Sequence, residues 1–251
     1  MIGMVTRSLL RGYGIVALLS CTAVLGWGLI AAHPSAAEPI TTKPTVVLVH
    51  GAWADASSWN GEMQVLEASG YVVRAIANPL ENLTTDSEYV ANVKALVYVD
   101  AAAPDVGETN GALSGADSVL KHKSDGELFE KPPYPGAPDG AADLYLKRDV
   151  FVQNFGNDLP ADVATRLWAT QRAASTAAFD TPSRHPAWKT IPSWYFISSG
   201  DQIITPTSER AMAARAHSTV TEFDGGSHLT LVSHPDAVTA VIIDAANSVS
   251  T

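Results

Sequence analysis

Short apolar runs separated by helix-length segments constrain the fold of this sequence more than any other feature. Residues 45–50 read TVVLVH, the continuous apolar run expected of a strand buried on both faces. Similar runs lie at 71–77 and 94–99, and a helical pattern ending at Gly70 joins the first run to the second. A capping-box pattern at 85–88 opens another short helix. Alternating strands and helices at this pitch form parallel βαβ units, so the sequence predicts an α/β domain with a mainly parallel sheet flanked by helices.

A long excursion then interrupts the alternating pattern. Residues 102–190 contain Gly- and Pro-rich stretches, a strand pattern at 144–151 and a helical pattern at 160–179. So long a connection is uncommon in a compact domain unless it covers a site. We therefore expect residues 102–190 to form a cap over the C-terminal ends of the strands.

The α/β pattern returns after this cap. A strand is expected at 194–199 and the last strand at 219–223. Between them, Thr205 opens a helix with Pro206 at its first position. The terminal helix is expected at 235–247.

The N-terminal residues have the pattern of a sorting segment. Two arginines precede an apolar stretch at 15–30, and small residues at 35–37 suit cleavage before Glu38. We therefore predict a signal peptide over 1–37, a mature domain over 38–251, and a secreted or cell-envelope location.

Two other interpretations of the N-terminal segment remain. The apolar stretch is near the lower limit for an uncleaved single-span anchor. Lipid attachment at Cys21 is the other, because residues 18–21 loosely resemble a bacterial lipobox, although the apolar residues continuing to Ile30 argue against cleavage there. Cys21 is the only cysteine, which excludes a disulfide framework and a cysteine-based zinc site.

Charge excludes some partners. The 16 Lys and Arg residues against 26 Asp and Glu residues give a net charge of −10, with no basic cluster beyond the first dozen residues. A nucleic-acid partner is not expected from this balance. Contact with a membrane is expected only through the N-terminal segment, and the expected partner is a small-molecule substrate or ligand.

An acid and a histidine follow the last two expected strands. Asp201 stands in Ser-Gly-Asp-Gln and His228 in Gly-Gly-Ser-His. Loops at the C-terminal ends of parallel strands line the same crevice. An acid there can fix the tautomer of a histidine that acts as a general base. The alternative is structural, with Asp201 capping a turn and His228 a polar loop residue.

Small residues follow the first buried strand in His50-Gly51-Ala52-Trp53. Such a loop leaves backbone N–H groups free to face an oxyanion. Taken alone it is also consistent with a simple turn.

Several motifs together resemble the α/β-hydrolase superfamily, in particular the small esterase group that includes plant methylesterases and hydroxynitrile lyases. They are VLVHGAW at 47–53, SSW at 57–59, SGD at 199–201, SH at 227–228 and SHP at 233–235. The resemblance implies a hydrolase of small carboxylic esters or related carbonyl compounds. It also implies that Asp201 is the triad acid, His228 the triad base and the Ala52 N–H one arm of the oxyanion hole.

The nucleophile of that family is missing from this sequence. The family carries it on Gly-x-Ser-x-Gly, a strained turn between a central strand and a helix, and no serine here has that spacing. The gap falls between Ala91 and Asn92 and corresponds to roughly one βα unit, about 30 residues. We therefore expect a sheet that is one central strand short.

Other residues are candidates to replace the nucleophile. Asp100 ends a strand, but Tyr98 stands two residues before it, where an elbow needs a small residue. Asp100 is then a family-typical residue or an alternative acid for His228. Ser57, Ser58 and Ser227 are the nearest serines in sequence, and each also fits a role as a helix cap or loop hydroxyl.

Three functional hypotheses follow from these residues. The first is the esterase-type hydrolase, the second a non-catalytic relative that binds a small apolar ligand in a capped pocket, and the third an internally deleted form that folds poorly. No cofactor and no metal are expected, because the sequence contains neither a Gly-rich phosphate loop nor a metal-ligand spacing among its histidines.

Overall fold

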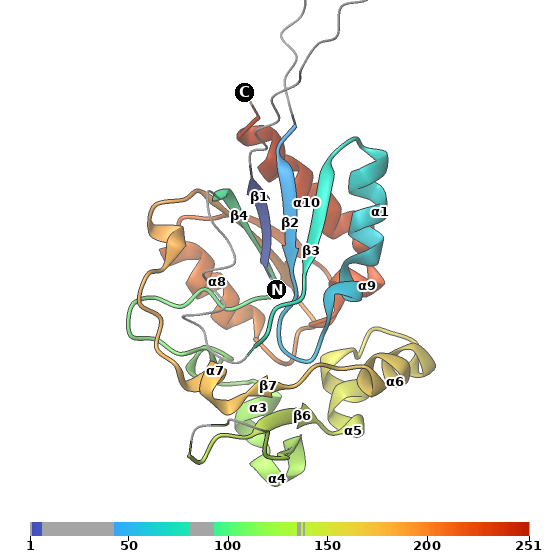
Figure 1. The fold of residues 1–251 in the computed structure, drawn as a ribbon, viewed down its shortest axis with the longest axis vertical. Coiled ribbons are helices and arrows are strands. Elements are labelled where there is room, and N and C mark those ends of the chain that lie inside the picture. The colour runs from blue at the N-terminus through green and yellow to red at the C-terminus, as the bar shows by residue number, and fades with distance from the viewer. Residues whose placement is uncertain (1, 7–42, 81–92, 135–136, 138, 251) are drawn as a thin grey trace, which may run out of the picture.

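All five expected strands are present in the computed structural model (Figure 1), which describes residues 2–6, 43–80, 93–134, 137 and 139–250. They are β2 (Thr45–Val49), β3 (Val72–Ile76), β4 (Val93–Val99), β8 (Ser193–Ser198) and β9 (Thr219–Phe223). Strand β2 pairs with β3, β4 with β8 and β8 with β9, all in parallel. The predicted α/β fold with a mainly parallel sheet is therefore confirmed.

A sixth strand, β1 (Ile2–Thr6), lies between β2 and β4. It runs antiparallel to both, so that Met4 is opposite Val47 on one side and Leu96 on the other. The sheet order is β3-β2-β1-β4-β8-β9. This differs from the expected sheet that is one central strand short, because β1 pairs with the N–H and C=O groups that β2 and β4 would otherwise leave unpaired.

The first residues thus take part in the fold, which differs from the expectation that 1–37 lie outside it. Residues 7–42 fall outside the described part of the chain, and the predicted cleavage site and apolar stretch lie there. The helix expected from the capping-box pattern at 85–88 also lies outside the described residues. No helix in the described part is both long and apolar enough to span a membrane.

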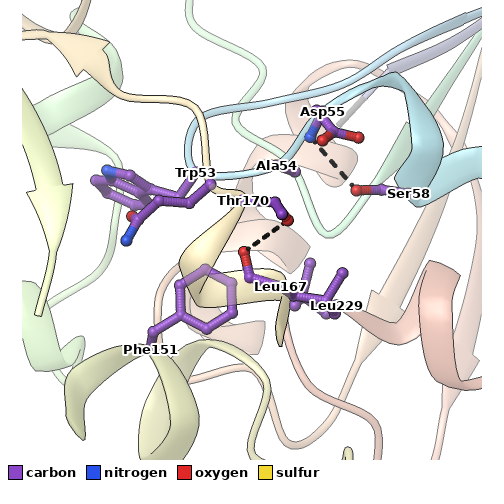
Figure 2. Close-up of a pocket in the computed structure, with 9 residues that line it drawn as sticks. Trp53, Ala54, Asp55, Ser58, Phe151, Leu167, Thr170 and Leu229 are labelled. Carbon is purple, nitrogen blue, oxygen red and sulfur yellow. Dashed lines mark hydrogen bonds between the residues drawn. The ribbon is translucent and has the colours of Figure 1, made fainter. Parts of the chain in front are cut away.

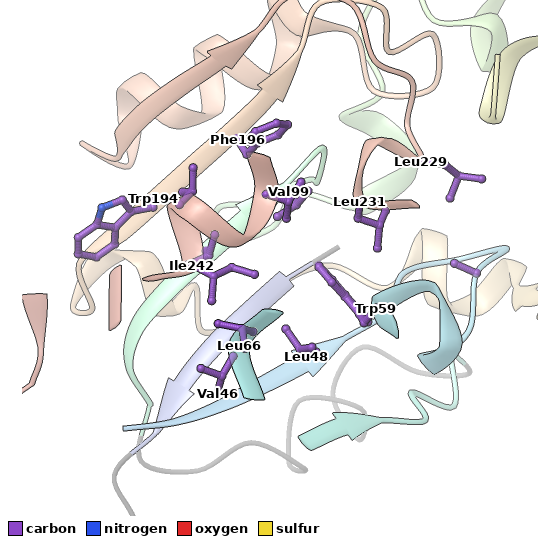
Figure 3. Packing of buried hydrophobic residues seen from close by; sticks show 14 of the residues in the cluster. Val46, Leu48, Trp59, Leu66, Val99, Trp194, Phe196, Leu229, Leu231 and Ile242 are labelled. Carbon is purple, nitrogen blue, oxygen red and sulfur yellow. The ribbon is translucent and has the colours of Figure 1, made fainter. Parts of the chain in front are cut away.

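Helices cover both faces of the sheet. The helices α1 (Asn60–Ala68) and α10 (Pro235–Ser248) pack on one face, where Leu48, Leu66 and Ile242 belong to one buried cluster (Figure 3). Helix α8 (Pro206–Arg215) packs on the other face with its buried Met212 and Ala213. Alternate residues of β4 and β8 enter the two clusters, which explains why their sequences are apolar without interruption.

Asp55, and not Ser58, caps the first helical segment. The short helix η1 (Ala56–Trp59) precedes α1, and the Asp55 carboxylate accepts the Ser57 N–H at 2.7 Å. Ser58 reciprocates as the third residue of a capping box, since its hydroxyl accepts the Asp55 N–H. The predicted capping role of Ser58 is therefore replaced by this reciprocal role.

The cap consists of short elements rather than the long ones expected. The strand predicted at 144–151 is a shorter strand followed by two helical turns, and the helix predicted at 160–179 ends at Ala169. Side-chain and backbone bonds to neighbouring cap segments interrupt both patterns, for example where Gln171 binds both the N–H and the C=O of Leu146. The cap elements are η2 (Asn110–Ala112), α3 (Val119–His122), α4 (Asp125–Leu128), β5 (Phe129–Glu130), β6 (Asp143–Leu146), α5 (Arg148–Val150), η3 (Phe151–Phe155), α6 (Ala161–Ala169), β7 (Ala174–Ser175), α7 (Thr176–Asp180) and η4 (Ala187–Lys189).

The cap packs over the C-terminal ends of the parallel strands, as predicted (Figure 1). Just beyond β2, the Trp53 N–H donates to the Arg172 carbonyl at 3.0 Å and the Trp53 indole donates to the Leu144 carbonyl at 2.8 Å. Beyond β8, the Thr205 N–H donates to the Ser114 carbonyl at 2.8 Å. These bonds attach the cap to the loops that carry the candidate site.

Candidate active site

Asp201 and His228 are in direct contact at the C-terminal end of the sheet. The loops after β8 and β9 bring His228 Nδ1 to 2.6 Å from Asp201 Oδ2. Only 3% of Asp201 and 8% of His228 are exposed, so the pair is shielded from solvent. The predicted contact between these two side chains is confirmed, and their catalytic role stays a prediction.

The hydrogen bonds around Asp201 fix the tautomer of His228. The other carboxylate oxygen accepts the Ile203 N–H at 2.7 Å and the Ile204 N–H at 3.2 Å. Three N–H groups therefore point at one carboxylate, with Nδ1–H of His228 as the third. Nε2 of His228 then carries the lone pair, and it has no hydrogen-bond partner among the described residues. This is the orientation that a general base requires.

Aromatic side chains from the cap and from the β2 loop form one wall of the site. The Phe155 ring centroid is 5.0 Å from that of His228, and the Phe155 ring meets Trp53 edge-on at 5.8 Å. Trp53 also stacks between Phe129 at 5.8 Å and Phe179 at 5.4 Å. The histidine therefore lies against an apolar surface from which water is largely excluded.

The loop after β2 presents the Ala52 N–H without a partner among the described residues. Trp53 has a φ of 60°, a left-handed conformation that is unusual for a bulky residue. Neighbouring His50 is neutral, because burial lowers its pKa and its Nε2 accepts the Asn78 N–H at 3.0 Å. The free N–H is consistent with the oxyanion role that the resemblance implies for Ala52, which stays a prediction.

None of the candidate serines is bonded to His228. The Ser57 hydroxyl donates to Asp55, and Ser58 Oγ accepts the Asp55 N–H at 3.4 Å. Ser227 is fully buried, and its Oγ accepts the Leu229 N–H at 3.0 Å. All three hydroxyls therefore serve local turns in this structure, as the structural alternative for each expects.

A small pocket lies beside the site (Figure 2). Its volume of about 10 Å³ is the room that one water molecule needs. An ester substrate therefore requires movement of the cap or of side chains. The lining residues are Trp53, Ala54, Asp55, Ser58, Phe151, Leu167, Thr170, Gln171 and Leu229.

A cluster of three buried carboxyl groups was not predicted from the sequence. Oxygen atoms of Asp100, Asp201 and Glu209 lie within 4.8 Å of one another. Burial raises the pKa of Asp100 and of Glu209 well above the usual range, and the neighbouring carboxyl groups add to this. Hard oxygen donors of this kind suit cations such as Ca²⁺ or Mg²⁺. However, Asp201 and Asp100 already accept hydrogen bonds from the protein, and only Glu209 has no partner in the described structure.

Asp100 does not bond to His228, although it was considered as an alternative acid. Its carboxyl group accepts the Ser198 N–H at 2.8 Å and lies 2.9 Å from the Ser198 hydroxyl. The acid in contact with the histidine is Asp201. Glu209 lies on α8, and nothing in its sequence neighbourhood distinguishes it from a solvent-exposed helical residue.

Comparison with known families identifies this arrangement. The alpha/beta hydrolase family matches residues 80–241, which is more than half of the chain. The chain belongs to the alpha/beta hydrolase family. The match includes Asp201 and His228 but begins after β2, so the loop that carries Ala52 precedes it. No curated protein matches the chain at a significant level.

Solved structures of alpha/beta hydrolases are similar in fold over most of the chain. Polyneuridine aldehyde esterase is 14% identical, with a TM-score of 0.61, covering 79% of this chain and 97% of its own. Methylesterase MES16 from Arabidopsis is 14% identical, with a TM-score of 0.61 and coverage of 81% and 98%. An extracellular alpha/beta-hydrolase from a Paenibacillus species is 18% identical, with a TM-score of 0.60 and coverage of 79% and 97%. At these identities the likeness establishes the fold.

Proposed function

We propose that this alpha/beta hydrolase binds small carboxylic esters or related carbonyl compounds at the Asp201–His228 pair, without a serine acyl-transfer step. The 2.6 Å contact between these side chains carries the proposal, because it preserves the acid and base of an ester-hydrolysing site. The similar folds of two esterases support the same substrate class.

The centre of the sheet supports the proposed absence of serine turnover. Acyl transfer needs an oxygen nucleophile within about 3 Å of the base and facing the oxyanion donors. Strand β1 occupies the position between β2 and β4, and no described serine bonds to His228. The base therefore has no hydroxyl to activate in this structure.

Serine-based ester hydrolysis is the second candidate function. Ser58 favours it, because this side chain lines the small pocket together with Leu229, the residue after His228. Its hydroxyl would have to leave the Asp55 N–H and approach Nε2 of His228. A movement of the η1 turn is the change that would achieve this.

We expect a serine-directed phosphonate to leave the protein unlabelled under conditions that label an intact serine esterase stoichiometrically. We also expect a short activated ester to be hydrolysed no faster by the wild type than by His228→Ala, because no candidate serine is bonded to His228. Activated esters make this a lenient test, because their good leaving groups need little general-acid help. Intact-protein mass spectrometry and initial rates measure the two quantities. Stoichiometric labelling that is lost in both His228→Ala and Ser58→Ala would establish the second candidate instead, and Ser227→Ala serves as the matched serine control.

Binding is tested separately from turnover. We expect an unreactive methyl ketone of similar size to raise the unfolding temperature of the wild type and to have a smaller effect on His228→Ala. Equal shifts in both proteins would place the ligand elsewhere.

We also propose export directed by residues 1–37, supported by the apolar stretch and the small residues before Glu38. Protein secreted by an expressing host is then expected to begin at Glu38. N-terminal sequencing of protein from the medium measures this, and an intact N-terminus in a membrane fraction would favour the single-span anchor. A lipid-modified Cys21, detected by mass spectrometry, would favour the lipoprotein interpretation.

A further inference from the structure

A line of buried oxygen atoms connects Asp100 to the loop that carries His228. Asp100 Oδ2 lies 2.9 Å from Ser198 Oγ, which lies 2.7 Å from Thr230 Oγ1. Thr230 Oγ1 in turn lies 2.6 Å from the carbonyl oxygen of Ser227. All four residues are buried with no measurable exposure. The line therefore consists of three direct oxygen–oxygen contacts at hydrogen-bond distance.

The number of hydrogens available to these three contacts shows which group must donate in the contact between Asp100 and Ser198. Each of the three contacts needs a hydrogen, because two oxygens this close without one repel each other. The hydroxyls of Ser198 and Thr230 supply one hydrogen each, and the Ser227 carbonyl supplies none. The Thr230 hydroxyl must donate to this carbonyl, so the Ser198 hydroxyl must donate to Thr230. The remaining contact has only the Asp100 carboxyl group as a donor.

We propose that Asp100 is a neutral carboxylic acid and that its proton heads a one-way chain of hydrogen bonds, through Ser198 and Thr230, to the Ser227 carbonyl. Asp100 is then a positioning residue for His228 rather than an alternative acid. The role of His228 as a base rests on the proposed function, whereas the protonation of Asp100 does not.

The charges around Asp100 support its neutrality. Asp201 and Glu209 face it with carboxyl oxygens within 4.8 Å, and the buried Tyr195 lies on the adjacent strand. Asp201 is the member that accepts three N–H groups, including that of His228. No Lys or Arg in the described part of the chain forms an ion pair with Asp100. A second negative charge there would face repulsion and burial without a compensating cation.

This chain of hydrogen bonds, together with Gly226, holds the loop before His228 in place. Ser227 accepts from the Thr230 hydroxyl and from the Thr230 N–H at 3.1 Å. Gly226, with a φ of 69°, covers the chain so closely that a Cβ there would lie 2.3 Å from Thr230 Oγ1 and 3.1 Å from Ser198 Oγ. The carbonyl that precedes His228 is therefore fixed, and with it the direction in which the ring meets Asp201.

Three substitutions test this chain of hydrogen bonds, and the measured quantity is the urea concentration at the midpoint of unfolding. Asp100→Asn keeps the chain of hydrogen bonds, because the amide oxygen accepts the Ser198 N–H while the amide NH₂ donates to the Ser198 hydroxyl. We expect its midpoint to equal that of the wild type, and those of Asp100→Ala and Thr230→Val to fall. Thr239→Val is the matched control, since Thr239 is buried but its hydroxyl has no partner among the described residues.

Infrared difference spectra at neutral pH measure the proton directly and do not depend on ester turnover. The wild type minus Asp100→Asn spectrum is expected to contain the carbonyl stretch of a protonated carboxylic acid. A carboxylate band in its place would overturn the proposal. So would a midpoint for Asp100→Asn as low as that of Asp100→Ala, because an ionised Asp100 accepts two donors and an amide NH₂ would clash with one of them.

Discussion

Replacing Glu62 with glutamine is expected to stabilise this protein strongly near pH 8 and much less near pH 4. Glu62 lies on α1 with no exposed surface, and neither of its carboxyl oxygens has a partner among the described residues. Burial raises its pKa from 4.5 to about 8, and the charge of Asp236 adds to the shift. The cause is the packing of α1 on the start of α10, where a Cβ on Gly61 would lie 2.5 Å from Pro235.

The direction in which the free energy of unfolding changes with pH follows from the proton that Glu62 keeps in the folded state. Between pH 4.5 and about 8 the folded protein keeps the proton on Glu62 while the unfolded chain has lost it. The free energy of unfolding therefore falls as pH rises through this range, by about 1.4 kcal/mol per pH unit, and is level outside it. The accumulated penalty at pH 8 is of order 5 kcal/mol, and glutamine, which does not ionise, removes it.

Urea unfolding at several pH values measures this effect. The difference between Glu62→Gln and the wild type should grow steadily from pH 4.5 to 8. Glu67→Gln is the matched control, because it makes the same change on an exposed residue of the same helix and should leave the pH dependence unchanged. Parallel curves for Glu62→Gln and the wild type would show that Glu62 is hydrated in solution.

The sequence allowed the Asp201–His228 pair to be predicted because parallel strands impose a simple rule. Asp201 follows β8 and His228 follows β9, and the C-terminal ends of these neighbouring parallel strands meet at one edge. No knowledge of the cap or the helices was needed. The 2.6 Å contact between His228 Nδ1 and Asp201 Oδ2 agrees with this rule.

Buried carboxyl groups could not be predicted in the same way. On α1 the charged residue Glu62 is buried together with Leu66, whereas the apolar residue Met63 is only half-buried. Glu209 is also a charged residue of a helix, and it is buried on α8 beside Asp100 and Asp201. Helical periodicity places a residue on a face but does not show how wide the covered face is.

The central strand was missed for a different reason. Residues 2–6 precede arginines and an apolar stretch, a pattern that indicates a sorting segment. The strands they pair with, β2 and β4, lie far along the chain, and the local sequence contains no sign of these partners. The strand found at the centre of the sheet is antiparallel and comes from the other end of the chain, so its pairing is a tertiary event.

Removing residues 1–6 is therefore expected to expose the centre of the sheet. Strand β1 is paired along its whole length with β2 on one side and β4 on the other. Without it, both strands present unpaired N–H and C=O groups in the middle of the sheet, and each buried group left without a partner costs roughly 1–3 kcal/mol. This loss, repeated along two edges, is the largest effect expected of any change described.

Hydrogen exchange followed by mass spectrometry measures the loss strand by strand. We expect amides in β2 and β4 to exchange faster in the shortened protein, while those in β8 stay protected by pairing with β9. Met4→Pro should reproduce the effect in part, because proline lacks the N–H that a central strand donates, and Met4→Leu should not.

The same experiment decides what export does to the fold. Cleavage before Glu38 would remove β1 together with the sorting segment, so the processed protein would have to close the sheet in another way. If protection of β2 and β4 is the same with and without residues 1–6, these strands pair with each other in solution and the folded domain does not need β1. If protection is lost, the chain folds with its full sheet only while its N-terminus is retained, and a processed protein would be the poorly folding form expected from the internal gap.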